Sequence, residues 1–209
     1  MAPPLLIFDT NVVVDVWLER DGDQASLLVT LAETGKLELA LPELVLAEFR
    51  GRALTWIREQ LDKCESQVLK HANGWERSTV LGDGAERIKE GVNELKAGLE
   101  TLRTSIEPLI DRLTRVAQVA GHTPGLHLKG ELRFLRGLPP GRPGESLQDC
   151  RIYEAILEIA RADAANIRTR RIFATRDRDF TDFPELVTEL RVHGVELTTA
   201  MVPLYAELR

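Results

Sequence analysis

Short apolar runs alternate with amphipathic stretches at both ends of the chain. Residues 5–8 and 172–175 are apolar runs without polar alternation, which is typical of strands buried on both faces of a sheet. Further strands are expected at residues 36–41 and 195–197. Apolar spacings of three and four predict helices between these strands, at residues 23–35, 42–52, 146–160 and 182–194. Strands that alternate with helices in this way favour a parallel α/β sheet.

The middle of the chain has a different pattern. Apolar residues from Ile88 to Ala120 recur in steps of four and three, and a shorter stretch from Leu54 to Val68 does the same. This seam predicts two long helices that pack as an antiparallel hairpin, with Pro108 bending the longer one. The same seam would also suit an oligomer interface. We therefore expect a single α/β domain over residues 1–209, with its core in 1–52 and 143–209. Residues 53–142 are expected to form a helical insertion and a basic, Gly/Pro-rich loop.

The composition is that of a soluble globular protein, with 44% hydrophobic and 29% charged residues among 209. No apolar run approaches the roughly 20 residues of a membrane span, so no membrane partner is expected. The N-terminus lacks the basic region of a signal peptide. The two cysteines, Cys64 and Cys150, form no motif. A reducing, cytoplasmic location is the simplest expectation.

Charge is distributed unevenly along the chain, whose net charge is -6. Residues 112–142 hold six lysines and arginines against Glu131, and residues 168–178 hold five arginines against Asp177. Basic stretches in an acidic protein can serve a polyanionic ligand, although each stretch alone also fits a solvated helix face.

Several acids break the hydrophobic pattern. Glu48 and Asp149 share helical faces with apolar residues, and Asp9 and Asp177 directly follow predicted strands, with Asp179 two residues later. Burying a carboxylate is costly unless it is paired or binds a metal, and for any single acid an ion pair with an arginine is an adequate explanation. Acids that converge at the carboxyl edge of a sheet would instead suit Mg²⁺ or Mn²⁺, which prefer oxygen ligands.

Other catalytic motifs are absent from the sequence. It contains no Walker-type phosphate loop, no H-E-x-x-H and no G-x-S-x-G. Its four histidines are scattered without metal-ligand spacing: His71, His122, His127 and His193. Metals held by carboxylates alone favour activation of water and displacement at a phosphodiester.

Four segments resemble, in order and spacing, the acidic motifs of PIN-domain nucleases: "LLIFDTNVVVD", "LPELVLAEFRGR", "SLQDCRIYEAILEIA" and "RIFATRDRDF". The resemblance covers roughly residues 1–52 and 143–209. It implies a PIN-like three-layer fold with a mainly parallel sheet, and it implies roles for particular residues. The implied catalytic and metal-binding acids are Asp9, Glu48, Asp149 and Asp177, with Asp179 as a further metal ligand and Asn11 and Thr175 as supporting groups.

The long insertion departs from small toxin-type PIN proteins and is similar to larger bacterial PIN-like proteins with a helical insertion. The expected function is hydrolysis of phosphodiester bonds by metal-activated water, with RNA favoured over DNA and two Mg²⁺ or Mn²⁺ ions bridging the scissile phosphate. Arginines near the third and fourth acids are expected to hold the nucleic-acid backbone: Arg133, Arg136 and Arg142 first, then Arg176 and Arg178.

Two other functions are compatible with the sequence. A catalytically silent PIN scaffold could bind RNA or a protein through the helical insertion. An aspartyl phosphoryl-transfer enzyme is a weaker alternative, since "DTN" lacks a second acid two residues after Asp9. Oligomeric state, sequence preference and any cognate antitoxin stay open at this level.

Overall fold

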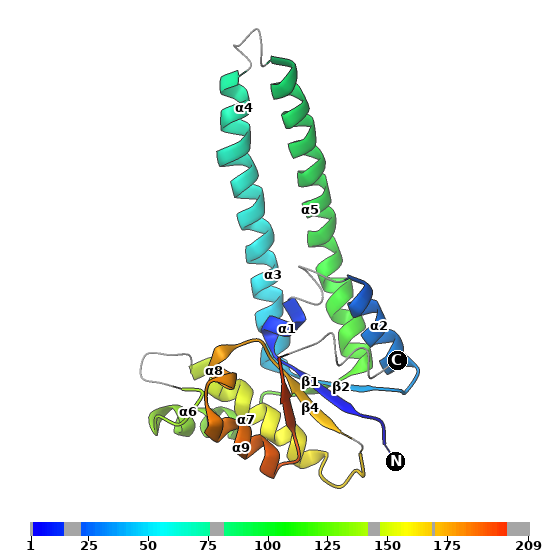
Figure 1. Ribbon diagram of the computed structural model, residues 1–209, viewed down its shortest axis with the longest axis vertical. Helices are drawn as coiled ribbons and strands as arrows, with labels where there is room; N and C mark the ends of the chain where they lie inside the picture. The colour runs from blue at the N-terminus through cyan, green and yellow to red at the C-terminus, as the bar shows by residue number, and fades with distance from the viewer. Residues whose placement is uncertain (1, 15–21, 76–81, 142–146, 169, 200–209) are drawn as a thin grey trace. The chain divides into compact units, whose positions relative to one another are not determined.

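A computed structural model describes five ranges of the chain, and Figure 1 shows their arrangement: 2–14, 22–75, 82–141, 147–168 and 170–199. The chain divides into two compact units. The α/β unit comprises residues up to Phe49 together with those from Arg112 onward, and the helical unit comprises Arg50–Asp111. Helices α3 and α5 each contribute residues to both units.

Five parallel strands form the sheet of the α/β unit, in the order β3-β2-β1-β4-β5. Leu6 in the central strand lies opposite Leu39 on one side and Ile172 on the other. The strands are β1 (Leu5–Phe8), β2 (Glu38–Pro42), β3 (Ala117–Ala120), β4 (Arg171–Ala174) and β5 (Glu196–Thr198). All four residues of β1 are buried, which confirms the sequence-based expectation of a strand covered on both faces.

Helices cover both faces of this sheet. Helix α2 covers one face, and α7 and α9 cover the other (Figure 1). The helices of the unit are α1 (Thr10–Val14), α2 (Gly22–Glu33), α6 (Pro124–Leu135), α7 (Leu147–Ala162), α8 (Arg178–Thr181) and α9 (Pro184–Val192). The expected three-layer α/β fold is therefore confirmed. None of the helices within the described ranges has the length and apolar character needed to cross a bilayer.

Residues 117–135 differ from the sequence-based expectation, which extends the long helix to Ala120 and places a basic loop after it. They form β3, which pairs with β2, and α6, which begins where the Thr123 side chain accepts a hydrogen bond from the amide of Leu126. The α/β unit therefore resumes at Arg112, and the helical unit is shorter than the insertion expected at residues 53–142. The four residues of β3 (AQVA) are too few for a periodic signal. For residues 200–209 the sequence predicts a closing helix or turn, and these residues lie outside those that the structure describes.

The helical unit contains the hairpin arms. The first arm runs through α3 (Glu43–Lys63), a π-helical segment at Cys64–Leu69 and α4 (Lys70–Trp75); the second is α5 (Gly82–Val116). In α5 one row of the predicted seam is buried in steps of seven, at Val92, Leu99 and Ile106. The other row is more open, and Leu95 is 51% exposed. Only half of the predicted seam is therefore fully buried.

A network of ion pairs joins the amino ends of the strands. The carboxylate of Asp163 accepts hydrogen bonds from Nε of Arg168 (2.6 Å) and Nε of Arg171 (2.7 Å), and Arg168 also binds Glu38. Burial alone would raise the pKa of Asp163, but hydrogen bonds from Arg168, Asn166 and Arg171 outweigh it and hold the pKa below its usual range. The acids at this edge of the sheet are thus neutralised by arginines.

Candidate active site

Asp9 lies at the carboxyl end of the central strand β1. Its amide donates to the carbonyl oxygen of Ala174 in β4 (3.0 Å), so the sheet ladder fixes its position. One carboxylate oxygen accepts from the amide of Thr10 (2.6 Å) and the other from Oγ1 of Thr175 (2.9 Å). The residue is only 4% exposed.

Burial raises the pKa of Asp9 to about 6. The hydrogen bonds from Thr175 and Thr10 oppose this shift, whereas the negative charges of Asp177 and Glu48 add to it. Asp177 and Glu48 are therefore close enough to repel the charge on Asp9. No cation among the described residues pairs with Asp9.

Glu48 approaches this point from α3, the helix that follows β2. Its side chain is half-buried, and it accepts a 2.5 Å hydrogen bond from Oγ1 of Thr10. Thr10 is 1% exposed, so its hydroxyl has few alternative partners. A single threonine thus touches two of the acids, Asp9 through its amide and Glu48 through its hydroxyl.

Asp177 follows β4 and caps the N-terminus of α8. Its carboxylate accepts from the amide of Asp179 (3.0 Å) and from Nδ2 of Asn11 (3.0 Å). The amide of Asp177 donates to Oγ1 of Thr175 (3.0 Å), the same hydroxyl that donates to Asp9. Thr175 is fully buried and links the ends of two neighbouring strands.

The other two predicted ligands come from different elements. Asp149 lies in the first turn of α7 and Asp179 in the first turn of α8, and both are half-buried. The backbone amide of Asp179 contributes to the site by donating to Asp177. The metal-binding roles expected for the Asp149 and Asp179 carboxylates remain predictions.

The donor set suits a hard divalent cation, because it consists of carboxylate oxygens around a buried acid without a positive partner in the described part of the chain. Within the described residues, however, no group of three or more histidines, cysteines, aspartates or glutamates has a metal-binding arrangement as it stands. Hydroxyl and amide groups satisfy the carboxylates instead. The carboxylate oxygens are therefore suitable ligands for a cation. In the present arrangement, hydrogen bonds from hydroxyl and amide groups hold these carboxylates in place.

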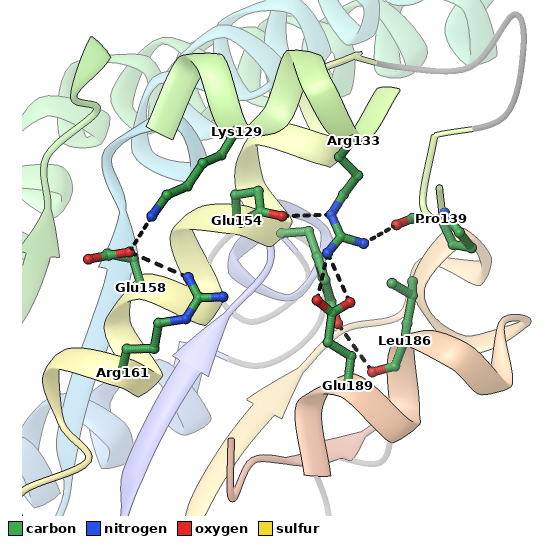
Figure 2. A network of polar contacts seen from close by, with 9 residues as sticks. Lys129, Arg133, Pro139, Glu154, Glu158, Arg161, Leu186 and Glu189 are labelled. Carbon is green, nitrogen blue, oxygen red and sulfur yellow. Dashed lines mark hydrogen bonds and ion pairs between the residues drawn. The ribbon is translucent and has the colours of Figure 1, made fainter. Parts of the chain in front are cut away.

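Arg133, for which the sequence predicts contact with nucleic acid, has an internal position. Figure 2 shows its guanidinium between α7 and α9, where it donates to Glu154 (2.7 Å), to the Pro139 carbonyl (2.7 Å) and to both oxygens of Glu189 (2.7 and 2.9 Å). It also lies over the ring of Tyr153. Burial would lower the pKa of Arg133, but the bonds to Glu154 and Glu189 raise it overall. These contacts favour a structural role.

The remaining predicted arginines differ from Arg133. Arg136, Arg176 and Arg178 are exposed, Arg136 at the C-terminal cap of α6 and the other two beside Asp177. Arg142 lies outside the described residues. Three of the arginines that are predicted to contact the nucleic-acid backbone are thus on the surface, where a polyanion could reach them.

Thr10 is the site residue that the sequence pattern does not assign. By its type it is only a residue that favours the start of a helix. What points to Thr10 in the sequence is its position between Asp9 and Asn11, because both of these residues have predicted roles in the site. Its partner Glu48, however, is 38 positions away and comes together with it only in the fold.

The chain is an α/β protein with a parallel sheet and acids at its carboxyl edge, which is where open α/β sheets usually bind their ligands. The sequence model described as PIN domain matches residues 6–180, and the chain belongs to the PIN domain family. The predicted resemblance to this family is thereby confirmed.

A solved structure with a similar fold is titled the crystal structure of VapBC2 from Rickettsia felis bound to a DNA fragment from their promoter. The likeness has a TM-score of 0.43 at 10% identity and covers 93% of this chain and 98% of that one. No curated protein matches the sequence.

Proposed function

We propose that this PIN-domain protein is a divalent-metal-dependent nuclease that hydrolyses phosphodiester bonds, with RNA favoured as substrate. One observation carries the proposal. Asp9 is buried beside two further acids without a cationic partner among the described residues, and a structural carboxylate has no reason to be kept in that state. Family membership supports the same function.

Mg²⁺ or Mn²⁺ would be held by Asp9, Glu48, Asp149 and Asp177, with Asp179 at the margin. When bound, the cation would supply activation of water and stabilisation of charge on the phosphate. The protein's own contribution is orientation: Thr10 fixes Glu48, Asn11 fixes Asp177, and Thr175 fixes Asp9.

The substrate would be positioned by exposed cations. Arg136, Arg176 and Arg178 would contact backbone phosphates, which set register without reading sequence. A protein with a net charge of -6 needs such local cations to hold a polyanion. Arg133 has no part in this proposal, since its donors bind Glu154, Glu189 and Pro139. The proposal includes a cytoplasmic location, because the two cysteines form no motif and a reducing compartment is the simplest expectation for them.

A catalytically silent PIN scaffold is the second candidate. The observation in its favour is that Thr10 and Asn11 already satisfy Glu48 and Asp177 without any metal. A scaffold of this kind would bind RNA or a protein through the helical insertion without cutting it.

Cleavage of a mixed RNA oligonucleotide pool separates the two candidates. The wild type with Mn²⁺ should cut the pool, chelation should stop cleavage, and Asp9→Asn should reduce the rate by about a thousandfold, the scale of losing a principal electrostatic group. Asp182→Asn serves as the matched control, because it removes an exposed aspartate near the site and should cut normally. If purified wild type binds the pool but never cuts it with Mg²⁺ or Mn²⁺, the scaffold is correct. Parallel incubation with single-stranded DNA tests the preference for RNA.

A further inference from the structure

The N-terminal part of α7 lies against two glycines that belong to other segments. A Cβ added at Gly130, in the interior of α6, would lie 2.6 Å from Cγ, 2.9 Å from Cα and 3.0 Å from the backbone nitrogen of Arg151. A Cβ added at Gly141 would lie 2.5 Å from Sγ of Cys150. Cys150 and Arg151 directly follow Asp149 in the chain. Each of them therefore lies against a position that has no room for a side chain.

The backbone conformation does not require glycine at either position. Among the glycines that the structure describes, positive φ angles occur at Gly35, Gly137 and Gly194, and not at Gly130 or Gly141. In a helix interior glycine is less favourable than alanine, because it loses more backbone entropy on folding. The space that the two glycines leave for α7 is therefore the structural reason for their presence.

The neighbour of Gly130 is backbone. Cα and the backbone nitrogen of Arg151 are part of α7 and cannot rotate away from an added methyl group. Gly130 is itself buried, so the methyl group could not turn toward solvent either. An alanine at this position would have to separate α6 from α7 two residues beyond Asp149.

The neighbour of Gly141 is a thiol without free space around it. Cys150 is fully buried, so its Sγ cannot rotate toward solvent. The chain before Gly141 is also held in place. The amide of Gly141 donates to the carbonyl oxygen of Leu138 (3.1 Å), and Arg133 donates to the carbonyl oxygen of Pro139 (2.7 Å; Figure 2). An alanine at position 141 would therefore push on Cys150 and on the first turn of α7.

We propose that Gly130 and Gly141 are positioning residues for Asp149, because the space that they leave sets where the first turn of α7 holds its carboxylate. The inference rests on the proposed function, in which Asp149 is a metal ligand. Functional groups of this kind must be held within about 0.5 Å of their working geometry. A methyl group at either glycine requires a displacement of at least that order, since contacts of 2.5–3.0 Å must lengthen toward the roughly 3.5 Å of van der Waals separation.

Isothermal titration calorimetry of the full chain with Mn²⁺ tests the proposal. Gly141→Ala should weaken Mn²⁺ binding by about 10–100-fold, the scale of losing a group that orients a metal ligand. Adding Cys150→Ala removes the Sγ that the methyl group meets, so the double variant should recover most of the affinity. Cys150→Ala alone should bind Mn²⁺ like the wild type. Circular dichroism at the titration temperature confirms that every variant is folded, so that the measured change is one of affinity.

Gly130→Ala provides a second, independent disruption and should weaken Mn²⁺ binding on the same scale. Its matched control is Gly125→Ala in the same helix, where an added Cβ would lie 3.8 Å from Oγ1 of Thr123, an ordinary contact. Gly125→Ala should bind Mn²⁺ like the wild type.

The NMR chemical shift of the Asp149 backbone amide provides a readout without metal. The shift should differ between the wild type and Gly141→Ala, and it should be the same in Cys150→Ala and in the double variant. The proposal is overturned if Gly141→Ala and Gly130→Ala both keep the wild-type Mn²⁺ affinity and Asp149 shift, or if Cys150→Ala does not repair the loss in Gly141→Ala. If the wild type itself binds no Mn²⁺, the proposed function fails, and the Asp149 shifts alone decide whether the two glycines position this residue.

Discussion

Asp9 combines burial with two acidic neighbours, and this has a consequence for stability. Its pKa of about 6 in the folded protein exceeds the ordinary value of 3.8. The folded state therefore holds a proton that the unfolded state has released between about pH 4 and 6, and the contribution of Asp9 to stability falls as pH rises through 6. Above pH 6 the buried charge costs about 3 kcal/mol.

Asp9→Asn tests this linkage in protein without divalent ions. The gain in unfolding free energy over wild type should increase by about 2 kcal/mol between pH 4.5 and 7.5, as chemical denaturation would measure. Asp182→Asn is the control variant, because it removes an exposed aspartate that does not contact Asp9. A pH-independent difference for Asp9→Asn would mean that Asp9 is charged at every pH tested.

Thr10 should affect the acidic site through its hydroxyl alone. Thr10→Val keeps the shape of the side chain and the hydrogen bond from the backbone amide of residue 10 to Asp9. It removes the hydroxyl that donates to Glu48. Removing such an orienting group typically lowers metal affinity or activity by about 10–100-fold. Isothermal titration with Mn²⁺ should show that fall, and Thr10→Ser should restore the affinity. Wild-type affinity in Thr10→Val would show that Glu48 needs no orientation.

The elements that sequence predicts best are those with a strong local pattern. The end of β1 just before Asp9, and the helix stop at Gly35, where φ is +69°, follow from residues next to one another. β3 does not follow from sequence, because a four-residue strand has no period of its own and is defined by pairing with β2. The internal contacts of Arg133 do not follow from sequence for a similar reason: its partners Glu154 and Glu189 are 21 and 56 positions away.

Arg133 joins three helices, and its removal should act on stability. Arg133→Met leaves Glu154 buried beside no cation, which typically costs about 3–5 kcal/mol. Arg136→Met, on the exposed cap of the same helix, should change the free energy of unfolding by less than about 0.5 kcal/mol. Urea denaturation distinguishes the two. If Arg133→Met is as stable as the wild type but binds RNA more weakly, Arg133 has the nucleic-acid role that the sequence predicts.

Two leucines of α5 in the hairpin provide a matched pair of substitutions. Leu99 is 7% exposed and Leu95 is 51% exposed, although both belong to the predicted seam. Leu99→Asp should therefore destabilise the helical unit by about 3–5 kcal/mol, whereas Leu95→Asp should cost less than about 1 kcal/mol. Hydrogen exchange along α5 would report the local destabilisation. Equal effects would show that both rows are buried in solution.

At the scale of the molecule, an acidic protein that binds RNA must do so through a few cations. Changing Arg136, Arg176 and Arg178 together to Ala should weaken RNA binding and reduce the salt slope by about 0.7 for each phosphate that the variant no longer binds. Arg103→Ala is the control, because Arg103 pairs with Glu100 in the helical unit. Binding by fluorescence anisotropy across salt concentrations gives the slope. An unchanged slope in the triple variant would place the RNA elsewhere.

The acids at the two edges of the sheet have opposite electrostatic surroundings. Arg168 and Arg171 neutralise Asp163 at the amino edge, whereas Asp9 at the carboxyl edge is held among like charges. A laboratory selection for heat resistance alone should accordingly accumulate neutral substitutions at the carboxyl edge, since each removes repulsion. The same selection should leave the arginines of the amino edge unchanged. The pattern of accepted substitutions would then mark the edge that natural selection has kept for a purpose other than folding.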